Sequence, residues 1–355
     1  MTLGTDLNDD VLTEILVRLP PKSILRCRAV CKRWRHATTC ATFLATYSLR
    51  RPLDLILDSQ HNSFNEYPLD RVALDGGDGC RRLLDHRPSL KFLASCDGLL
   101  LFWISMSPHG VTFVICNPAT RQCARFPAMA TKPGMWVVPS GFYFHRPSGK
   151  HRVLCFGKNE GDEDIFQGII RYSQVHYVLS TGAGQPRRLR PFTDFIGNTP
   201  SPPFGVDVGG TLHWAQHPWI GGNSSAMLAF DTVSEKFRRM PLPPVAADHF
   251  INLFEMRGKL AASVMGEWPF LDVWALDNYA GERWSHNVRV ELPAEAAATV
   301  PNYRVKYGEA VAALEGDVLV LFTVGGWVTL YDVKKKKTVR VVRRGDNRAS
   351  RHWGV

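Results

Sequence analysis

A short pattern of residues recurs along most of the chain, and this repeat limits the fold more than any other feature of the sequence. Each copy has a glycine turn before an apolar strand, then a second strand ending in Asn or Asp, a tight turn and a third strand. The turn glycine and the Asn or Asp of four copies are Gly98 and Asn117, Gly210 and Asp231, Gly258 and Asp277, and Gly316 and Asp332. Asn and Asp favour such turns because their side chains accept a hydrogen bond from the backbone two residues on. Repeated units of this kind predict an all-β architecture.

Two further hairpins occupy the interval between the first and the second copy. One starts at Gly141 with its turn at 146–149, and the other starts at Gln174 with its turn at 180–184. Together they are expected to form one more four-stranded unit. Residues 52–58 have the pattern of an isolated strand, which we expect to complete the last sheet and close a ring. The sequence therefore predicts a β-propeller of about six blades, whose radial sheets leave only short edges.

The first part of the chain, before these strands, has apolar residues at helical spacing. Asn8 or Asp9 is expected to cap a first helix, and Pro20-Pro21 is expected to end it, since proline donates no backbone hydrogen bond. A second helix should follow, with Trp34 as the largest apolar anchor of the segment. Short helices with this much Leu and Ile cannot bury all of it among themselves. Part of their apolar surface is therefore expected to contact a partner.

The same segment resembles an F-box. The residues that carry the resemblance are Arg18-Leu19-Pro20, Ser23-Ile24 and Val30-Cys31-Lys32-Arg33-Trp34, although the family usually opens with Leu-Pro and this chain has Leu7-Asn8. The resemblance implies docking onto a Skp-family adaptor and, through it, onto the cullin scaffold of an SCF-type ubiquitin ligase. The docking residues expected on this basis are Leu7, Val11, Leu12, Ile15, Leu16, Leu19, Pro20, Ile24, Leu25, Val30 and Trp34. Among them, Leu16, Pro20, Ile24 and Trp34 are the expected main anchors.

The β region resembles the kelch-like F-box-associated domain that follows plant F-boxes. This resemblance rests on Ser95–Leu100, Asn117–Thr120, Gly209-Gly210 and Leu212–Trp214. It implies a substrate receptor that holds a target protein for ubiquitination and carries out no catalysis itself. The expected domains are an F-box over 1–48, a propeller over 49–343 and a flexible basic tail over 344–355.

Target recognition is expected on loops, where binding residues concentrate on rigid scaffolds. The longest irregular insertions are expected at 128–140, 192–203 and 216–225, and they contain Trp136, Phe195 and Trp219. We expect these three aromatic residues to contribute to a common target-binding face, because exposed aromatic residues often anchor interfaces. The alternative is that each ring packs under its own loop. Whether the target is a peptide or a glycan, and which face binds it, stays open.

Composition and motifs exclude several other classes of protein. The hydrophobic fraction of 45% is enough for a folded core, and the N-terminus shows no signal peptide, so cytoplasm or nucleus is the expected location. The apolar window 90–106 is interrupted by Asp97-Gly98, which argues against a membrane span. No G-x-S-x-G, H-E-x-x-H or P-loop motif is present, so no catalytic residue is expected.

Cysteine and acidic residues give no metal pattern. The eight cysteines form no C-x-x-C pair and are expected to be reduced thiols, and residues 160–164 are expected to be a solvated acidic turn. We therefore expect no metal ion and no cofactor. The net charge of +10 is compatible with nucleic acid as well as with acidic proteins. A basic propeller that binds nucleic acid, with the helices as a generic interaction module, is the rival hypothesis. It is disfavoured because only Tyr331 lies near the basic run 334–337, whereas nucleic-acid grooves interleave aromatic and basic residues.

Overall fold

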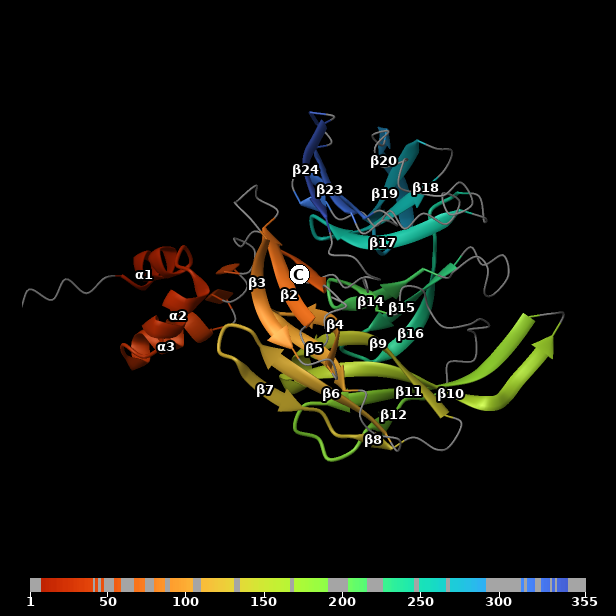
Figure 1. Cartoon of the computed structure of the whole chain (residues 1–355), viewed down its shortest axis with the longest axis horizontal. Helices are drawn as coiled ribbons and strands as arrows, with labels where there is room; N and C mark the ends of the chain where they lie inside the picture. Colours follow the sequence, from red (N-terminus) through yellow and green to blue (C-terminus); the bar gives the residue numbers. More distant parts are fainter. Residues whose placement is uncertain are drawn as a thin grey trace, which may run out of the picture. The chain divides into compact units, whose positions relative to one another are not determined.

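The computed structural model of this 355-residue chain is shown in Figure 1. It describes residues 8–40, 42–43, 46–47, 54–58, 67–73, 80–86, 90–104, 110–130, 135–166, 169–190, 204–215, 226–245, 249–265, 269–291, 314–315, 318–322, 327–332, 334–335 and 337–343. The chain divides into two compact units, one that contains the helices and one that contains the strands. None of the helices in these ranges is both long and apolar enough to cross a membrane.

Three short helices form the first unit: α1 (Asp9–Leu16), α2 (Pro21–Cys27) and α3 (Lys32–Thr39). The side chain of Asn8 caps α1 by accepting a hydrogen bond from the backbone of Asp10, and Pro21 occupies the first turn of α2. The Cys31 side chain accepts a hydrogen bond from the backbone of Trp34 at the start of α3. The cap at Asn8 and the start of α2 at Pro21 therefore match the sequence prediction, whereas α1 ends at Leu16, before Pro20.

The strands of the second unit form antiparallel sheets, which we number as blades in chain order. Blade 1 contains β1 (Asp54–Asp58), β2 (Tyr67–Ala73) and β3 (Cys80–His86). Blade 2 contains β4 (Leu90–Cys96), β5 (Leu99–Ile104), β6 (Gly110–Asn117) and β7 (Gln122–Arg125), with β8 (Met129–Ala130) paired to β6. Blade 3 contains β9 (Met135–His145), β10 (Lys150–Phe166), β11 (Ile169–Ser180) and β12 (Arg187–Arg188), with the 3-10 turn η1 (Arg146–Ser148) after β9.

Blade 4 contains β13 (Val206–Val208), β14 (Thr211–Trp214), β15 (Ala226–Asp231) and β16 (Lys236–Pro241). Blade 5 contains β17 (Phe250–Met256), β18 (Lys259–Met265), β19 (Phe270–Asn278) and β20 (Arg283–Glu291). Blade 6 contains β21 (Leu314–Glu315), β22 (Val318–Phe322), β23 (Trp327–Asp332) and β24 (Lys337–Arg343). A parallel pairing of Met256 with Leu314 joins blades 5 and 6 into one eight-stranded sheet.

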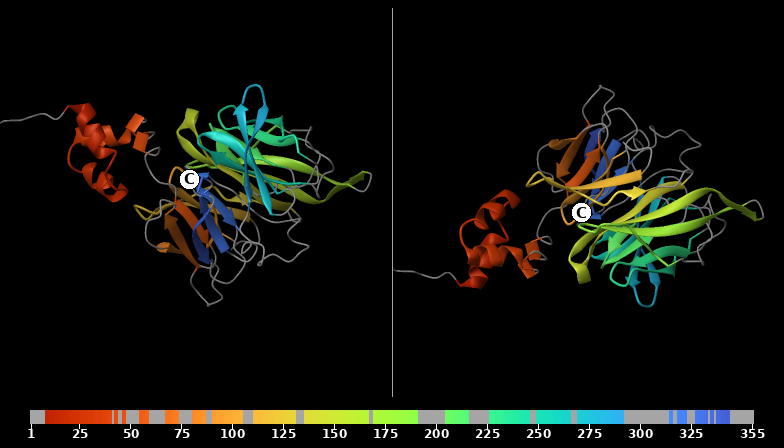
Figure 2. Two further views of the ribbon diagram at one scale, coloured as in Figure 1. Left: turned by 90° about the horizontal axis from the view of Figure 1, so that it is seen from above. Right: turned by 90° about the horizontal axis from the view of Figure 1, so that it is seen from below.

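Apolar side chains fill the space between consecutive blades. Leu69 of blade 1 packs with Phe92 and Phe102 of blade 2, and Phe113 of blade 2 packs with Phe142 of blade 3. Between blades 3 and 4, Leu154 packs with Trp214 and Phe230. Between blades 4 and 5, Met227 packs with Leu253 and Leu260, and between blades 5 and 6, Phe254 packs with Tyr331. The blades follow one another in chain order in Figures 1 and 2. This stacking of neighbouring sheets is the architecture of a β-propeller, and the predicted fold class is confirmed.

Local turn chemistry explains why the repeat folds in this way. Two-residue turns with positive φ join the first two strands of blades 2, 4 and 5, at Asp97-Gly98, Gly209-Gly210 and Arg257-Gly258. Such turns match the twist of the flanking strands, and they favour Asp-Gly and Gly-Gly. In the later turn of blade 4, Asp231 accepts hydrogen bonds from the backbones of Val233 and Ser234, as expected. In blade 5 the turn is capped by Asn278, one residue after the predicted Asp277.

Three sequence predictions about the strands and loops require correction. The strand at 52–58 does not complete the last sheet, because β1 pairs with β2 within blade 1. The segment 128–140 is not an irregular insertion, since it contains β8 and the start of β9. The acidic residues 160–164 belong to β10, which extends with β11 as a long ribbon (Figure 1). By contrast, the two hairpins predicted at 146–149 and 180–184 are confirmed as parts of one four-stranded blade.

The cysteines are not all reduced. Cys116 and Cys123 are directly opposite each other on β6 and β7 and form a disulfide, with their Cα atoms 4.2 Å apart. Among the described residues, Cys27, Cys31, Cys40, Cys96 and Cys155 are free thiols. The prediction of reduced thiols therefore fails for one pair.

The last strands of the blades are exposed and basic. Their solvent-facing cationic residues are Arg125, Arg187, Arg188, Lys236, Arg238, Arg239, Arg283, Arg289 and Lys337. Charged side chains on edge strands disfavour pairing with a second sheet, because pairing would desolvate them. These cationic side chains therefore disfavour pairing at the open edges of the blades.

Candidate functional site

The helical unit has an apolar face that remains exposed. Helix α1 buries Leu12 and Leu16 against Ile24 of α2 and against Phe43. The side chains of Val11 and Ile15, four residues apart on the next stripe of the same helix, are 49% and 47% exposed. Helix α1 is therefore apolar on two adjacent stripes, of which only one lies in the core.

A hollow lies over the exposed stripe, and we call it the α1 hollow. It is lined by Asp10, Val11, Glu14, Ile15, Arg18 and Leu19. Arg18 and Glu14 form an ion pair of 3.4 Å along its border, and Arg33 of α3 contacts Asp9 at 2.8 Å. Exposed pairs of this kind contribute little to stability. Their effect is to frame an apolar strip with charges of both signs, as at the rim of a protein interface.

Side-chain hydrogen bonds hold the segments of the helical unit together. The hydroxyl of Tyr47 donates to the carbonyl of Leu19 over 2.8 Å, and the guanidinium of Arg28 donates to the carbonyl of Thr38 over 2.9 Å. The Thr38 hydroxyl, on a fully buried side chain, donates to the carbonyl of Trp34. The helical unit is therefore preorganised without a partner.

The predicted docking residues fall into three groups by burial. Leu12, Leu16 and Ile24 lie in the core of the helical unit, and Leu16 is 0% exposed. Val11, Ile15, Pro20 and Val30 are exposed, whereas Leu19, Leu25 and Trp34 are half-buried. Leu7 lies outside the described residues. Two of the four expected main anchors, Leu16 and Ile24, therefore serve the core, so their side chains are not available to a partner.

The structure brings none of the predicted target-binding residues together within the part of the chain that it describes. Trp136 lies on β9, where its backbone is in register with Lys158 of β10. Phe195 and Trp219 fall in segments outside the described ranges. The common target-binding face thus stays a prediction.

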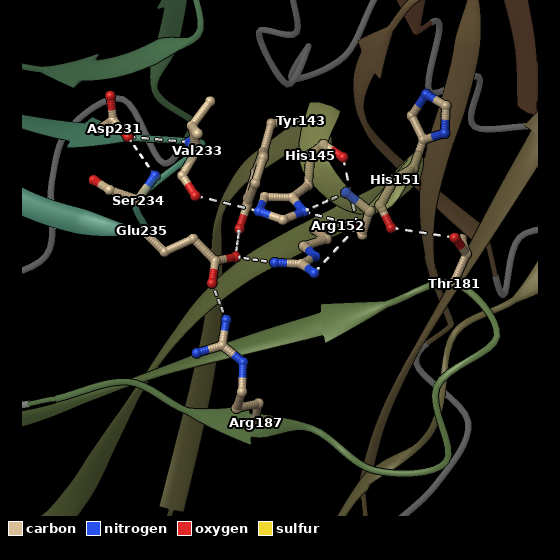
Figure 3. A network of polar contacts seen from close by, with 11 residues as sticks. Tyr143, His145, His151, Arg152, Thr181, Arg187, Asp231, Val233, Ser234 and Glu235 are labelled. Atoms are coloured by element: carbon tan, nitrogen blue, oxygen red, sulfur yellow. Dashed lines mark hydrogen bonds and ion pairs between the residues drawn. The ribbon is translucent and has the colours of Figure 1, made fainter.

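A polar network that the sequence gave no sign of connects blades 3 and 4 (Figure 3). Glu235 follows β15 with a φ of 53°, and its side chain reaches across to blade 3. Its carboxylate accepts hydrogen bonds from the Tyr143 hydroxyl at 2.7 Å, from Arg152 at 2.5 Å and from Arg187. Only 10% of the Glu235 side chain is exposed. A buried carboxylate with three donors is satisfied, so this network acts as a clamp between blades.

His145 extends the network toward the blade 4 turn. Its Nδ1 accepts a hydrogen bond from the backbone of Ser148, so its Nε2 carries the proton and donates to the carbonyl of Val233 at 3.3 Å. Burial, and then the positive charge of Arg152, lowers the pKa of His145, which favours this neutral form. Burial also raises the pKa of the Tyr143 hydroxyl. These shifts keep both groups uncharged near neutral pH, and the geometry supports packing rather than acid–base chemistry.

A small three-helix unit with an exposed apolar stripe, followed by a β-propeller, is the arrangement expected of an F-box protein with a propeller domain. Residues 5–41 match the F-box domain, and residues 80–351 match the family described as F-box associated beta propeller domain. The chain belongs to this F-box-associated propeller family. The resemblance that the sequence motifs indicated is therefore confirmed.

The chain is similar to curated proteins from Arabidopsis thaliana. The F-box/LRR-repeat protein At2g43260 is 27% identical over 319 residues, which cover 81% of this chain and 68% of the relative. The F-box protein At1g30790 is 25% identical over 391 residues, which cover 98% of this chain and 92% of the relative. The F-box/kelch-repeat protein At3g23880 is 23% identical, with coverages of 80% and 79%.

Proposed function

We propose that this protein is the substrate-recognition subunit of an SCF-type cullin ubiquitin ligase. Its F-box binds a Skp-family adaptor, and its propeller holds a target protein within reach of the transferred ubiquitin. The observation that carries the proposal is the exposed apolar stripe of α1 on a unit that matches the F-box. Catalysis belongs to the partners, so this chain needs no catalytic residue. Cytoplasm or nucleus is the corresponding location.

The residues that contact the adaptor follow from their burial. Val11, Ile15, Leu19, Pro20 and Val30 offer apolar surface to a partner. Ile15 is already about half buried, so covering the rest of its side chain contributes about half of the 1.5–3 kcal/mol for full burial, roughly 0.7–1.5 kcal/mol. Leu12, Leu16 and Ile24 contribute indirectly, because they fix the positions of the helices.

The propeller supplies the target-binding surface in this proposal. Its blades are joined by packed cores and by the Glu235 clamp, which gives loops a rigid support. Trp136, Phe195 and Trp219 remain the proposed contributors to this surface. The family assignment supports a protein target, while the chemistry of the recognised group stays open.

Co-purification with a Skp-family adaptor tests the proposal. We expect the full chain to form a one-to-one complex, and Ile15→Asp to abolish it, since burying an unpaired carboxylate is strongly unfavourable. Val339→Asp on β24 is the matched control, because Val339 is also 47% exposed but lies on the propeller. Complex formation by the Ile15→Asp variant, or no complex with the unaltered chain, would exclude this docking surface.

A further inference from the structure

Three side chains with metal-binding atoms converge where blades 2 and 3 meet. Cys96 is the last residue of β4, Asp97 is in the turn that follows, and His151 is the second residue of β10. One ligand atom from each lies within 4.8 Å of the other two. These residues are outside the adaptor-docking surface and outside the Glu235 clamp. They therefore need an explanation of their own.

The turn places the Asp97 side chain beside the thiol. Asp97 has a φ of 51° and Gly98 a φ of 73°, so Asp97-Gly98 is a two-residue turn that Asp favours. The corresponding turns of blades 4 and 5 contain Gly209-Gly210 and Arg257-Gly258, and they follow Val208 and Met256 instead of cysteine. The combination of thiol and carboxylate is thus particular to blade 2 among these three turns.

The imidazole of His151 has a ring nitrogen that is free to bind a ligand. Its Nε2 is buried and has no hydrogen-bond partner. Asp97 Oδ2 lies 3.6 Å from this nitrogen, which is beyond hydrogen-bonding distance. A buried polar atom without a partner is unfavourable, so such atoms in native proteins commonly mark a bound water or ion.

The charges around Cys96 favour a cation. The carboxylates of Asp97 and Asp207 lie close enough to act electrostatically on its sulfur. Without a cation the thiolate is disfavoured by both carboxylates. A divalent ion reverses this balance, because it attracts the thiolate and the carboxylate and accepts the lone pair of the imidazole.

We propose that Cys96, Asp97 and His151 form a Zn²⁺ site that joins the β4–β5 turn of blade 2 to β10 of blade 3. Sulfur, nitrogen and oxygen donors together suit zinc. In a tetrahedral zinc site, neighbouring ligand atoms lie about 3.3–3.6 Å apart, so side-chain movements of about 1 Å bring these three to the required spacing. Water takes the fourth position on the exposed side of Asp97. Binding releases the thiol proton of Cys96 to solvent, so the affinity falls as pH falls.

Cobalt titration of the full chain under reducing conditions tests the site, with Co²⁺ as the spectroscopic substitute for zinc. We expect a thiolate-to-cobalt charge-transfer absorption that saturates at one Co²⁺ per chain and is displaced by Zn²⁺. Cys96→Ser should remove this absorption. Asp97→Asn, which keeps a residue tolerant of positive φ, and His151→Gln should each weaken Co²⁺ binding by at least about tenfold. Circular dichroism confirms that each variant is folded.

Cys31→Ser is the matched control, because Cys31 is an exposed free thiol in the helical unit. This variant should keep the absorption unchanged. Absence of the absorption in the unaltered chain, or its persistence in Asp97→Asn and His151→Gln at full affinity, would overturn the proposal. If Cys96→Ser does not fold, these two variants decide the question. Adaptor binding does not involve this site. A failure to bind the adaptor would therefore leave the zinc proposal intact.

Discussion

Arg152 donates a hydrogen bond to Glu235 over 2.5 Å, although the two residues are 83 positions apart and belong to neighbouring blades. Their side chains are 14% and 10% exposed. An ion pair at this depth differs from the surface pairs elsewhere on the propeller, because removing one partner leaves the other buried and unpaired. The contact is therefore expected to control how firmly blade 4 is held against blade 3.

Glu235→Ala should destabilise the propeller by about 3–5 kcal/mol, as measured by urea denaturation. The loss arises because Arg152 and the Tyr143 hydroxyl both lose their acceptor. Glu282→Ala is the matched control. Glu282 also has positive φ in a hairpin turn and also pairs with an arginine, Arg238, but its side chain is 35% exposed. The control should lose about 1 kcal/mol or less of ion-pair stabilisation. Equal losses in the two variants would refute a special role for the clamp.

Acid sensitivity is expected from a buried histidine of blade 3. Burial lowers the pKa of His176 to about 4, and its ring packs between Phe156 and Phe237. In the unfolded chain, the His176 imidazole binds a proton with the ordinary histidine pKa of about 6.5. Between pH 6.5 and 4 the unfolded state therefore holds more protons, and the free energy of unfolding decreases as the pH falls.

In His176→Phe, the free energy of unfolding should depend less steeply on pH between 6.5 and 4. The difference in slope should correspond to the uptake of about one proton on unfolding. Unfolding free energies of the two proteins at several pH values between 7.5 and 4.5 measure the effect. Parallel pH profiles for the two proteins would show that His176 is charged in the folded state or does not titrate on unfolding.

The propeller was predictable because its signals are local. The turn at Asp97-Gly98 and the cap at Asp231 depend on residues adjacent in sequence, so the pattern is visible without tertiary information. The disulfide was predictable in principle from the same signals. Asn117 and Gln122 pair across the β6–β7 turn, which places the next residues outward, Cys116 and Cys123, opposite each other.

Contacts between blades were not predictable. Arg152 lies on a strand and Glu235 in a turn, and the spacing between them along the chain forms no motif. The same holds for Cys96 and His151. A metal pattern such as C-x-x-C needs ligands on one local segment, and this cluster takes them from two blades. Asp97 directly follows Cys96 in the sequence, but the two residues form a candidate metal site only together with His151.

The sequence did not separate the exposed stripe of α1 from the buried one, because helical periodicity identifies apolar stripes without saying which one faces the core. Leu12 and Leu16 occupy one stripe of α1, and Val11 and Ile15 occupy the next. In both stripes the apolar residues are four positions apart, so the sequence alone does not show which stripe is buried. Packing against Ile24 decides the matter.

Leu16 and Ile15 should therefore respond differently to truncation. Leu16→Ala removes a fully buried side chain and should destabilise the helical unit by about 2–5 kcal/mol. Ile15→Ala removes an exposed one and should leave helical circular dichroism unchanged while weakening adaptor binding. The readouts are thermal unfolding of the full chain and adaptor affinity by calorimetry. Retained stability in Leu16→Ala would contradict the assignment of Leu16 to the core.

Target capture is the remaining property to be assigned, and Trp219 is the proposed residue to test first. Its segment is rich in Gly and Pro, and tryptophan is the residue type most enriched among energetic centres of interfaces. Trp219→Ala should abolish co-purification of the target from native extract, because truncation of such a centre costs at least about 2 kcal/mol. The melting temperature and adaptor binding should stay unchanged.

Trp214→Ala is a control for a purely structural tryptophan, since Trp214 is buried between blades 3 and 4 and donates to the carbonyl of Ser140 over 3.0 Å. That control should lower the melting temperature. A fall in melting temperature of the Trp219→Ala variant, with target capture intact, would place Trp219 in the core and remove it from the proposed surface.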